Sequence, residues 1–522
     1  PTTLVVLAHA GFWVHVSLVL IFLNLLPHSK HFHVITGIPN VFFSDLGERG
    51  RMQPLAKGLE PLMATMEGIA ELPNPTAGQG AGVARIDHFS WKAILDFYTC
   101  TECGRCSDNC PAHRTGKILS PKHFTLALRD HLYENEANFI EKGMKSQLAA
   151  PAEEAAVAPL DTVDLVPNVI HPDVLWACTS CRACEEQCPV MISYVDKIMD
   201  MRRNLVLIKG EFPHTLQKPF QGIETNGNPW NLSRMDRAAW SDGLGVPMMS
   251  DKPDAKVLYW VGCAGSFDDK NKKVTQAMAQ LLQRAGIDFA ILGPNENCTG
   301  DPARRSGNEY IFQMLAMQNI ETLNGMGVRK IITQCPHCFN TLMNEYPQLG
   351  GNYEVVHHSQ FLEWLIDQGK LDLSEAKLEE RVVYHDSCYL GRHNDVYLAP
   401  RNVIGSLAGI EVVEATANGT KGMCCGAGGA RMFMEETIGT KINDARSEQL
   451  VETGANRVAT ACPFCYIMID DGVKGLGKDE DVKVADISMH LLEAIEKGEA
   501  DRIDVLHNDQ HGGSSLFETV ED

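Results

Sequence analysis

FYTCTECGRCSDNCP at residues 97–111 and LWACTSCRACEEQCP at residues 175–189 repeat one pattern, C-x₂-C-x₂-C-x₃-C-P. This run ligates a [4Fe–4S] cluster through three cysteines and lends its fourth cysteine to another cluster. Two copies therefore predict two cubanes. The expected ligands are Cys100, Cys103, Cys106 and Cys188 for one cluster, and Cys178, Cys181, Cys184 and Cys110 for the other.

Pro111 and Pro189 follow the fourth cysteine of each run, and a proline there turns the backbone so that the thiolate points toward the other cluster. A structural zinc site needs only four ligands, usually as two C-x₂-C pairs with a long spacer. Neither zinc nor disulfides explain four cysteines within eleven residues that occur twice. The 67 residues between Cys110 and Cys178 favour an α-helical ferredoxin module over the compact bacterial type.

Two further cysteine sets follow in the second half of the chain. Each begins after a strand-like run, KVLYWVGC at 256–263 and RVVYHDSC at 381–388, and each ends on C-P-x-C. Their spacings are 35 and 37 residues in the first set and 36 and 37 residues in the second, which indicates an internal duplication. The first set is Cys263, Cys298, Cys335 and Cys338, and the second is Cys388, Cys424, Cys425, Cys462 and Cys465.

Strand-like and helix-like segments alternate around these sets, which predicts α/β units with short parallel sheets. The cysteines stand where strands end, the usual ligand position in an open parallel sheet. Both C-P-x-C motifs are expected at a strand-to-helix turn, where amide N–H groups stabilise thiolate or cluster sulfur. The glycines of GAGG at 426–429 predict room for a bulky inorganic core against the backbone.

All 17 cysteines fall into these motifs, which leaves none for a disulfide framework and indicates a reducing compartment. The formal charge of −21 argues against a nucleic-acid partner, because phosphate binding needs a basic face. A soluble protein or a membrane is the better-suited partner. The 522 residues predict about three to four domains.

Residues 4–26, LVVLAHAGFWVHVSLVLIFLNLL, contain no Asp, Glu, Lys or Arg and are long enough to cross a bilayer, which takes about 20 residues. Lys30, Arg49, Arg51 and Lys57 follow, which predicts the cytoplasm on that side. A secretory signal is disfavoured because no basic residue precedes the apolar run. We expect this helix to be the last of a larger membrane domain whose other helices lie outside this chain.

The two cysteine sets of the second half resemble the cysteine-rich CCG domains of the heterodisulfide reductase family, in which a complete five-cysteine set holds a non-cubane [4Fe–4S] cluster. The second set matches this pattern with HDSCYLGR, MCCGAGGARM and ACPFC, and the resemblance implies that its five cysteines are catalytic. The first set departs from it at NENCTGD, because Thr299 stands where the second adjacent cysteine belongs. Three interpretations of the first set remain open: an ordinary cluster, a zinc site and a vestigial scaffold.

Four polar residues flank Cys388: His385, Asp386, Arg392 and His393. They are candidates to deliver protons or to shape the field around the cluster. A helix cap or a local ion pair is the simpler interpretation for some of them. We assign His393 to the catalytic site together with the cysteines of the second set.

HVSLVLIFLNLLPHSKHFH at 15–33 resembles the last haem-binding helix of the cytochrome b subunit of respiratory nitrate reductases. Eighteen residues of helix span about 27 Å, roughly the hydrocarbon thickness of a bilayer. The resemblance implies that His15 and His33 each supply one axial ligand to a haem b, with the remaining ligands on helices outside this chain.

The order of parts resembles the membrane-bound iron–sulfur oxidoreductases that pass electrons from electron-transfer flavoprotein to menaquinone. The resemblance implies that the protein acts at the cytoplasmic face of the bacterial inner membrane. The sequence carries no flavin or nicotinamide fingerprint, so electrons are expected from a partner protein or a small thiol. Two alternatives stay open, a disulfide reductase that uses the non-cubane cluster and an electron-relay subunit of a 2-hydroxy-acid oxidase complex.

The expected multidomain architecture combines a transmembrane helix, an α-helical ferredoxin module and two α/β cysteine-rich domains. Its boundaries are 1–43 for the last transmembrane helix of a cytochrome b-like domain, 44–84 for an extended linker, 85–208 for the ferredoxin-like domain, 209–252 for a connector, 253–375 for the degenerate first cysteine-rich domain, 376–500 for the complete second one, and 501–522 for a tail.

Overall fold

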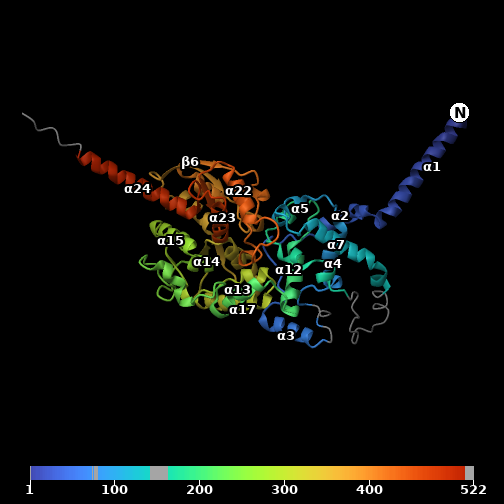
Figure 1. Ribbon diagram of the computed structural model, residues 1–522, viewed down its shortest axis with the longest axis horizontal. Helices are drawn as coiled ribbons and strands as arrows, with labels where there is room; N and C mark the ends of the chain where they lie inside the picture. Colours follow the sequence, from blue (N-terminus) through green and yellow to red (C-terminus); the bar gives the residue numbers. More distant parts are fainter. Residues whose placement is uncertain (1, 73–74, 76–79, 142–162, 512–522) are drawn as a thin grey trace, which may run out of the picture.

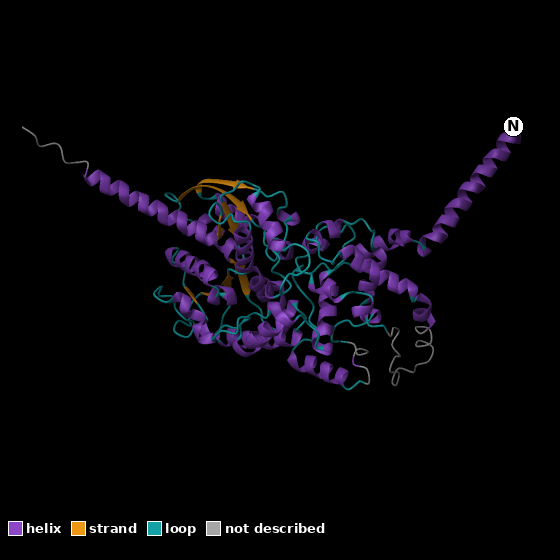
Figure 2. Cartoon of the chain, viewed as in Figure 1, coloured by secondary structure: helices purple, strands orange, loops and turns teal. Residues whose placement is uncertain are grey.

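The computed structural model describes residues 2–72, 75, 80–141 and 163–511. Two helices project from opposite ends of a central body, α1 near the N-terminus and α24 near the C-terminus (Figure 1). The strands lie in the half of the body that α24 leaves, whereas the half nearer α1 is built from helices and loops (Figure 2).

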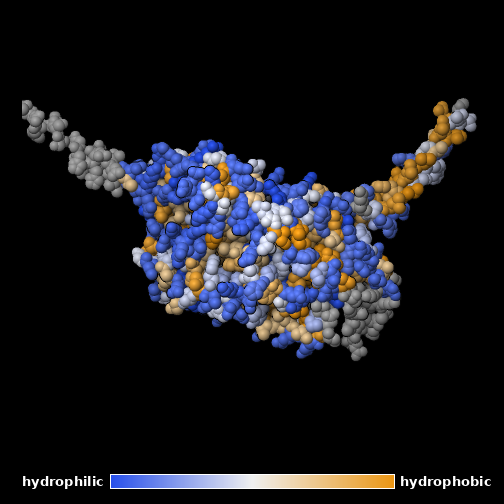
Figure 3. All heavy atoms as spheres, viewed as in Figure 1, coloured by the Kyte–Doolittle hydropathy of each residue, from blue (hydrophilic) through white to orange (hydrophobic). Residues whose placement is uncertain are grey.

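α1 (Thr2–Leu25) has no buried residue, and apolar side chains are exposed along it (Figure 3). By length and composition, Thr2–His28 is a candidate membrane span with a mean hydropathy of 2.1. The helix stops before Pro27, which lacks a backbone donor. Ser29 then accepts a hydrogen bond from the backbone N–H of His31, and a separate helix, α2, begins at His33.

The expectation of one continuous helix from His15 to His33 is therefore wrong. α2 (His33–Phe42) packs on α4 (Trp91–Thr99) of the ferredoxin module. The estimate of about 27 Å between the two histidines assumed an unbroken helix. The separation of His15 and His33 therefore does not support one haem ligand near each face of the membrane.

The linker expected at 44–84 is not extended throughout, because it contains α3 (Leu59–Ala70). Leu62 is fully buried, Ile69 is 5% exposed, and the helix packs against α17 (Glu309–Gly325) of the first cysteine-rich domain. Before α3, the amide of Asn340 donates to the carbonyl of Gly50 at 2.9 Å. The linker is thus a strap across the first cysteine-rich domain.

Short helices surround the two cysteine runs. After the first run, α7 ends at Glu134, where Asn135 leaves the helical conformation, and residues 136–141 are helical again. Fully buried Phe97, Leu128, Leu175 and Met199 form the core that holds these helices together. The main elements are α4, α5 (Arg105–Asp108), α6 (Pro111–Arg114), α7 (Pro121–Glu134), α10 (Pro172–Trp176), α11 (Ala183–Glu186) and α12 (Val195–Asn204).

Two four-stranded parallel sheets confirm the α/β prediction. Their strand orders, β2-β1-β3-β4 and β6-β5-β7-β8, are the same order repeated. In the central pairs Tyr259 lies beside Ile332 and Val383 beside Val458, all at most 1% exposed. The strands are β1 (Val257–Trp260), β2 (Phe289–Ala290), β3 (Lys330–Thr333), β4 (Glu354–His357), β5 (Lys377–Tyr384), β6 (Ala408–Val413), β7 (Arg457–Thr460) and β8 (Lys483–Asp486).

Helices cover both sheets and join the domains. α13 (Gln217–Asn226) and η7 (Arg234–Ser241) lie in the connector at 209–252. α24 (Ile487–His511) runs through the domain boundary expected at residue 500, so the first part of the expected tail is helical, and residues 512–522 lie outside the described range. The other long helices are α15 (Asp269–Arg284), α19 (His358–Asp367), α22 (Ile442–Val451) and α23 (Pro463–Gly475).

Candidate metal centres

The eight cysteines of the two runs lie in two groups of four, and each group lines one small cavity. The fourth cysteine of each run crosses to the other group. Tyr194 separates the groups, because its side chain lines both cavities. The first group is Cys100, Cys103, Cys106 and Cys188, and the second group is Cys110, Cys178, Cys181 and Cys184.

Backbone amides point at sulfur in both groups. The N–H of Ser180 donates to Sγ of Cys178, and the N–H of Ile192 donates to Sγ of Cys188, each at 3.4 Å. Burial raises the pKa of Cys100 and that of Cys178 to about 11. A bound metal is what deprotonates such thiols at neutral pH, so these sites suit a thiolate-ligated cofactor.

The second cysteine-rich domain gathers its five cysteines at the end of the sheet. Cys388 follows β5, Cys424 and Cys425 lie on a loop, and Cys462 and Cys465 lie at the start of α23. All five are at most 6% exposed. The N–H of residue 426 donates to Sγ of Cys424 at 3.3 Å, and a serine hydroxyl at position 387 donates to Sγ of Cys465 at 3.5 Å.

His385 completes this site. One of its ring nitrogens and the sulfurs of Cys425 and Cys465 lie within 4.8 Å of one another. Arg446 donates through Nε to Nδ1 of His385 at 3.1 Å. Because a guanidinium is only a donor, Nδ1 holds the lone pair and the neutral ring carries its proton on Nε2. Burial lowers the pKa of His385 to about 3, so the ring stays neutral.

Three buried donors around the second set have no acceptor in the described chain: Nε2 of His385, Nη2 of Arg392 and Nη2 of Arg446. A buried N–H without an acceptor costs about 1–3 kcal/mol, more for a charged group. An anionic group among the five cysteines would accept these hydrogen bonds. The residues present therefore fit an iron–sulfur cluster held by thiolates.

Buried arginines support the same conclusion. Within the described ranges, only Arg202, Arg392 and Arg446 among the buried arginines form no ion pair with a carboxylate. Arg202 donates to the carbonyl of Cys178 at 2.8 Å and stacks on Trp176. The positive charges of Arg392 and Arg446 lie close enough to the cysteines to interact with them. A buried charge needs a counter-ion, and clusters bound by these thiolates would supply one.

The first cysteine-rich domain brings Cys263, Cys298, Cys335 and Cys338 around one cavity, with Thr299 beside them. Oγ1 of Thr299 lies 3.8 Å from Sγ of Cys338. All four cysteines are buried.

An arginine of the connector supports the first set. Arg237 donates to Sγ of Cys263 at 3.4 Å and pairs with Glu296 at 2.7 Å. Burial opposes ionisation of Cys263, but hydrogen bonding from Cys298 and the charge of Arg237 outweigh it and lower the pKa of Cys263 to about 7. Arg237 already has a carboxylate partner, so this site carries less uncompensated positive charge than the second set.

The sulfurs of the first set lie as two pairs, Cys263 with Cys298 and Cys335 with Cys338. Among described residues, His385, Cys425 and Cys465 are the one group of three or more metal-binding atoms that lie within 4.8 Å of one another. Thiolates about 2.3 Å from a tetrahedral zinc lie about 3.8 Å apart. No three sulfurs of the first set lie that close to one another, so its thiols are not gathered as tightly as the ligands of a closed zinc site.

Three of the four cysteine groups touch. The thiols of Cys181 and Cys424 lie close enough to shift each other's pKa, and so do those of Cys335 and Cys462. The first contact joins the ferredoxin module to the second cysteine-rich domain, and the other joins the two cysteine-rich domains. With Tyr194 between the two groups of the ferredoxin module, the four groups form one row.

The glycines at 426–429 serve a different purpose from the one expected. A Cβ on Gly428 would lie 2.3 Å from the carbonyl oxygen of Thr179, and one on Gly429 would lie 2.4 Å from that of Cys178. The missing side chains let this loop approach the backbone of the ferredoxin module. The prediction that the three glycines of this segment make room for an inorganic core is therefore wrong for Gly428 and Gly429.

His393 is buried in an aromatic stack. The ring of Tyr389 lies 3.9 Å from that of His393 on one side and 3.9 Å from that of His337 on the other. Nε2 of His393 bonds to the carbonyl of Ser180 at 2.9 Å, and burial keeps its pKa well below the usual value. The structure thus places His393 against the loop of the second cysteine run.

The histidines assigned to haem lie apart from these groups. His15 is exposed on α1, and His33 begins α2 with its ring 6.3 Å from that of His31. No second histidine-bearing membrane helix lies among the described residues.

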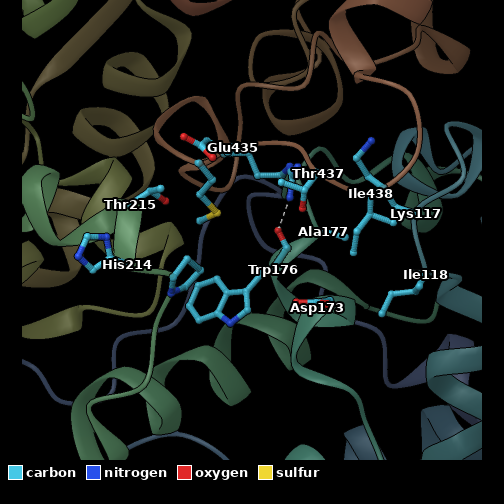
Figure 4. A pocket seen from close by; sticks show the side chains of 13 residues that line it. Lys117, Ile118, Asp173, Trp176, Ala177, His214, Thr215, Glu435, Thr437 and Ile438 are labelled. Carbon is cyan, nitrogen blue, oxygen red and sulfur yellow. Dashed lines mark hydrogen bonds between the residues drawn. The ribbon is translucent and has the colours of Figure 1, made fainter.

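A cavity of about 220 Å³ adjoins the second group of the ferredoxin module. Trp176 and Ala177, which directly precede Cys178, line it, and Glu435 and Thr437 lie across from Trp176 (Figure 4). Arg431 donates to the carbonyl of Trp176 at 2.6 Å. The segment that leads into a cysteine of that group therefore forms one wall of this cavity.

Sequence reasoning missed the charged residues that support the cysteines. Arg202 and Arg237 come from segments noted only as helix and connector, and Arg446 lies on α22, far in sequence from the cysteine motifs. One signal was available for Arg202. It stands on the apolar side of α12, where all of its neighbours at helical spacing are buried.

Known protein families match the same regions. The cysteine-rich domain family matches residues 257–343 and 382–470, and the 4Fe-4S dicluster domain matches residues 96–192. The matches coincide with the two sheets and with the module that holds the first eight cysteines.

Three curated relatives cover most of the chain. An EtfAB:quinone oxidoreductase of Syntrophomonas wolfei is 41% identical over 93% of this chain and 68% of its own length. A "Probable membrane-anchored ferredoxin" of Chromohalobacter salexigens is 36% identical over 82% of this chain and 64% of its own length. One of the subunits of the dihydromethanophenazine:CoB–CoM heterodisulfide reductase of Methanosarcina barkeri is 30% identical over 77% of this chain and 95% of its own length.

Proposed function

This chain belongs to the heterodisulfide reductase-like family of iron–sulfur oxidoreductases, and on that premise we propose that it passes electrons from a soluble flavoprotein to a membrane quinone. The observation that carries the proposal is the row of cysteine groups, which runs from the α2 end of the ferredoxin module to the sheets. Electrons cross a protein between closely spaced metal centres, and here neighbouring groups touch or share one side chain.

We assign two cubanes to the ferredoxin module, one to Cys100, Cys103, Cys106 and Cys188 and one to Cys110, Cys178, Cys181 and Cys184. The five cysteines of the second cysteine-rich domain hold a non-cubane [4Fe–4S] cluster, and His385, Arg392 and Arg446 donate hydrogen bonds to it. The first cysteine-rich domain holds a further cluster on its four cysteines. The unpaired guanidiniums support the assignment at the second cysteine-rich domain, and the gathering of four buried cysteines around one cavity supports the assignment at the first.

At the membrane end, α1 anchors the chain, and His15 and His33 bind haem b together with helices of a cytochrome b-like domain. Menaquinone is the proposed acceptor, and the chain lies at the cytoplasmic face of the bacterial inner membrane. Three observations support this membrane arrangement: the family resemblance, the exposed apolar α1, and the names of two relatives, a quinone oxidoreductase and a membrane-anchored ferredoxin. The proposal keeps the domain boundaries expected from the sequence, with α3 added to the linker and α24 extended to His511.

Electrons from the donor enter the chain beside Trp176. Electron-transfer flavoprotein is the proposed donor, because the Syntrophomonas relative is named an EtfAB:quinone oxidoreductase. The cavity lined by Trp176, Ala177 and Met434 is open to an approaching prosthetic group and adjoins Cys178. Electrons that enter there pass from the second cubane to the first, whereas the clusters of the two cysteine-rich domains lie on the other side of the entry point in the row.

The test is anaerobic metal analysis followed by turnover. The proposal expects about sixteen irons per chain, and reduced flavoprotein should reduce a menaquinone analogue through the membrane-bound protein. Eight irons, or electron transfer that does not depend on the flavoprotein, would contradict it. Substitution of Cys188 by serine should remove one cubane and abolish quinone reduction.

A second candidate function is reduction of a disulfide at the second cysteine-rich domain. The complete five-cysteine set and the Methanosarcina relative favour it. A protein that oxidises reduced flavoprotein only when a heterodisulfide is supplied, and ignores quinone, would establish this function instead. An electron-relay role in a 2-hydroxy-acid oxidase complex would require copurification with a flavin-dependent oxidase.

A further inference from the structure

α2 is a helix with its polar side turned inward. Thr36 is 5% exposed and donates to the carbonyl of Tyr98 at 3.5 Å, and Asn40 is fully buried and donates to the carbonyl of Val190 at 2.9 Å. Lys92 of α4 donates to Oδ1 of Asn40 at 2.9 Å. Three polar side chains therefore fix α2 to the ferredoxin module.

These contacts bring α2 to the first group of cysteines. Tyr98 lies two residues before Cys100, and Val190 lies two residues after Cys188. The rings of Phe32 and Tyr98 also pack against each other, with their centroids 5.7 Å apart. α2 is thus attached to both ends of the group that we assign to one cubane.

The outward side of α2 is apolar. Val34, Ile35, Ile38, Val41 and Phe42 are between 41% and 80% exposed, and their spacing of three or four residues places them on one face of the helix. Soluble proteins turn such a face inward. Exposed apolar groups of this size mark contact surfaces.

The same surface continues beyond the helix. Phe43 packs edge-on against Trp91 at 5.1 Å between ring centroids, and Trp91 is 63% exposed. Leu46 is 89% exposed. Aromatic side chains at the edge of an apolar surface are typical of the interface between lipid and water.

We propose that α2 lies flat in the interfacial layer of the lipid bilayer, with Ile38 and Phe42 toward the acyl chains and Thr36 and Asn40 toward the ferredoxin module. Amphipathic helices bind membranes in this orientation. Lipid is the occupant because α2 starts eight residues after α1, an apolar helix with no buried residue. The inference rests on the proposed membrane anchoring by α1.

The consequence concerns the depth of the first cysteine group. The anchor α1 alone would leave the body free to swing on the residues between Leu25 and His33. A second contact through α2 fixes the body, and it holds Cys100 and Cys188 directly above the lipid. Electrons then leave this group without a gap of water between protein and membrane.

Photo-crosslinking tests the proposal on the full chain in lipid nanodiscs. Benzoylphenylalanine is placed at Phe42, at Ile38, at Phe22 of α1 as the membrane control, and at Trp364 as an exposed control on α19. Trp364 is 43% exposed and lies on the first cysteine-rich domain. After illumination, adducts are identified by mass spectrometry, which separates lipid from peptide adducts.

The expected result is lipid adducts at Phe42, Ile38 and Phe22, each at least tenfold above the yield at Trp364. Lipid adducts at Phe22 combined with background yields at Phe42 and Ile38 would overturn the proposal while leaving the anchor intact. Peptide adducts at Phe42 and Ile38 would also overturn it, because another helix or a second copy would then cover the face. Absence of lipid adducts at Phe22 would refute the anchoring itself, together with the proposal that rests on it.

Discussion

Replacement of Arg446 by methionine should lower the midpoint potential of the cluster at the second cysteine-rich domain. Arg446 is fully buried, pairs with no carboxylate, and bonds through Nε to His385 at 3.1 Å. The ring nitrogen of His385 that faces the site lies within 4.8 Å of two cysteine sulfurs. The positive charge of Arg446 therefore favours the more negative, reduced state of the cluster.

The magnitude follows from the separation. The charge of Arg446 acts on Cys425 and Cys465. Two unit charges separated by about 8 Å interact with about 2 kcal/mol at an effective dielectric constant of about 20. One factor of ten in a one-electron equilibrium is 59 mV, or about 1.4 kcal/mol, so the expected shift is about −90 mV. Replacement by lysine keeps the charge and should shift the potential by less than half as much.

A potentiometric titration followed by EPR measures the shift. Replacement of Arg457 by methionine is the matched control, because Arg457 is also buried in this domain but is paired with Glu380 and Glu493, away from the cysteines. That variant should leave the potential within about 20 mV of wild type. A potential that is unchanged when Arg446 becomes methionine, in protein with full iron content, would refute the assignment of Arg446 as counter-ion to the cluster.

Three further changes are informative. Replacement of Thr299 by cysteine should complete a five-thiolate set and add a second non-cubane EPR signal, whereas serine at this position should not. Tryptophan in place of Thr215 should fill the cavity beside Trp176 and slow reduction by flavoprotein at least tenfold, with reduction by dithionite unchanged. Burial and then the charge of Glu185 raise the pKa of Asp196 to about 6, above its unfolded value, so this carboxyl costs stability increasingly as pH rises from about 4 to 6. Asparagine at this position should therefore stabilise the protein at pH 7, by at most about 3 kcal/mol, with no gain below about pH 4 in thermal unfolding.

The sequence was most informative where chemistry requires a fixed spacing. The grouping of Cys188 with the first run follows from the number of residues between cysteines, because a cubane needs ligands at those intervals. The parallel sheets follow from alternating apolar strands and helices, and both were found. These features depend on residues close to one another in sequence.

Features that join distant segments were not predictable in this way. Arg446 supports Cys425 and Cys465 only because α22 packs across α23, and Arg237 reaches Cys263 from the connector. The break between α1 and α2 was missed although Pro27 marked it, because the resemblance to a haem-binding helix favoured continuity. The polar inward side of α2 can be explained only from the structure, which places the carbonyl of Val190 and Lys92 of α4 beside Asn40.

The sulfur-to-sulfur contacts at Cys181–Cys424 and Cys335–Cys462 have a consequence for biogenesis. These sulfurs are buried where one domain packs on another, so a protein that delivers preformed clusters cannot reach them once the domains have packed. We expect the units to be filled while still apart and to close around their cargo afterwards. Cells starved of iron should then accumulate chains whose units never dock, and proteases would cut them at the joints.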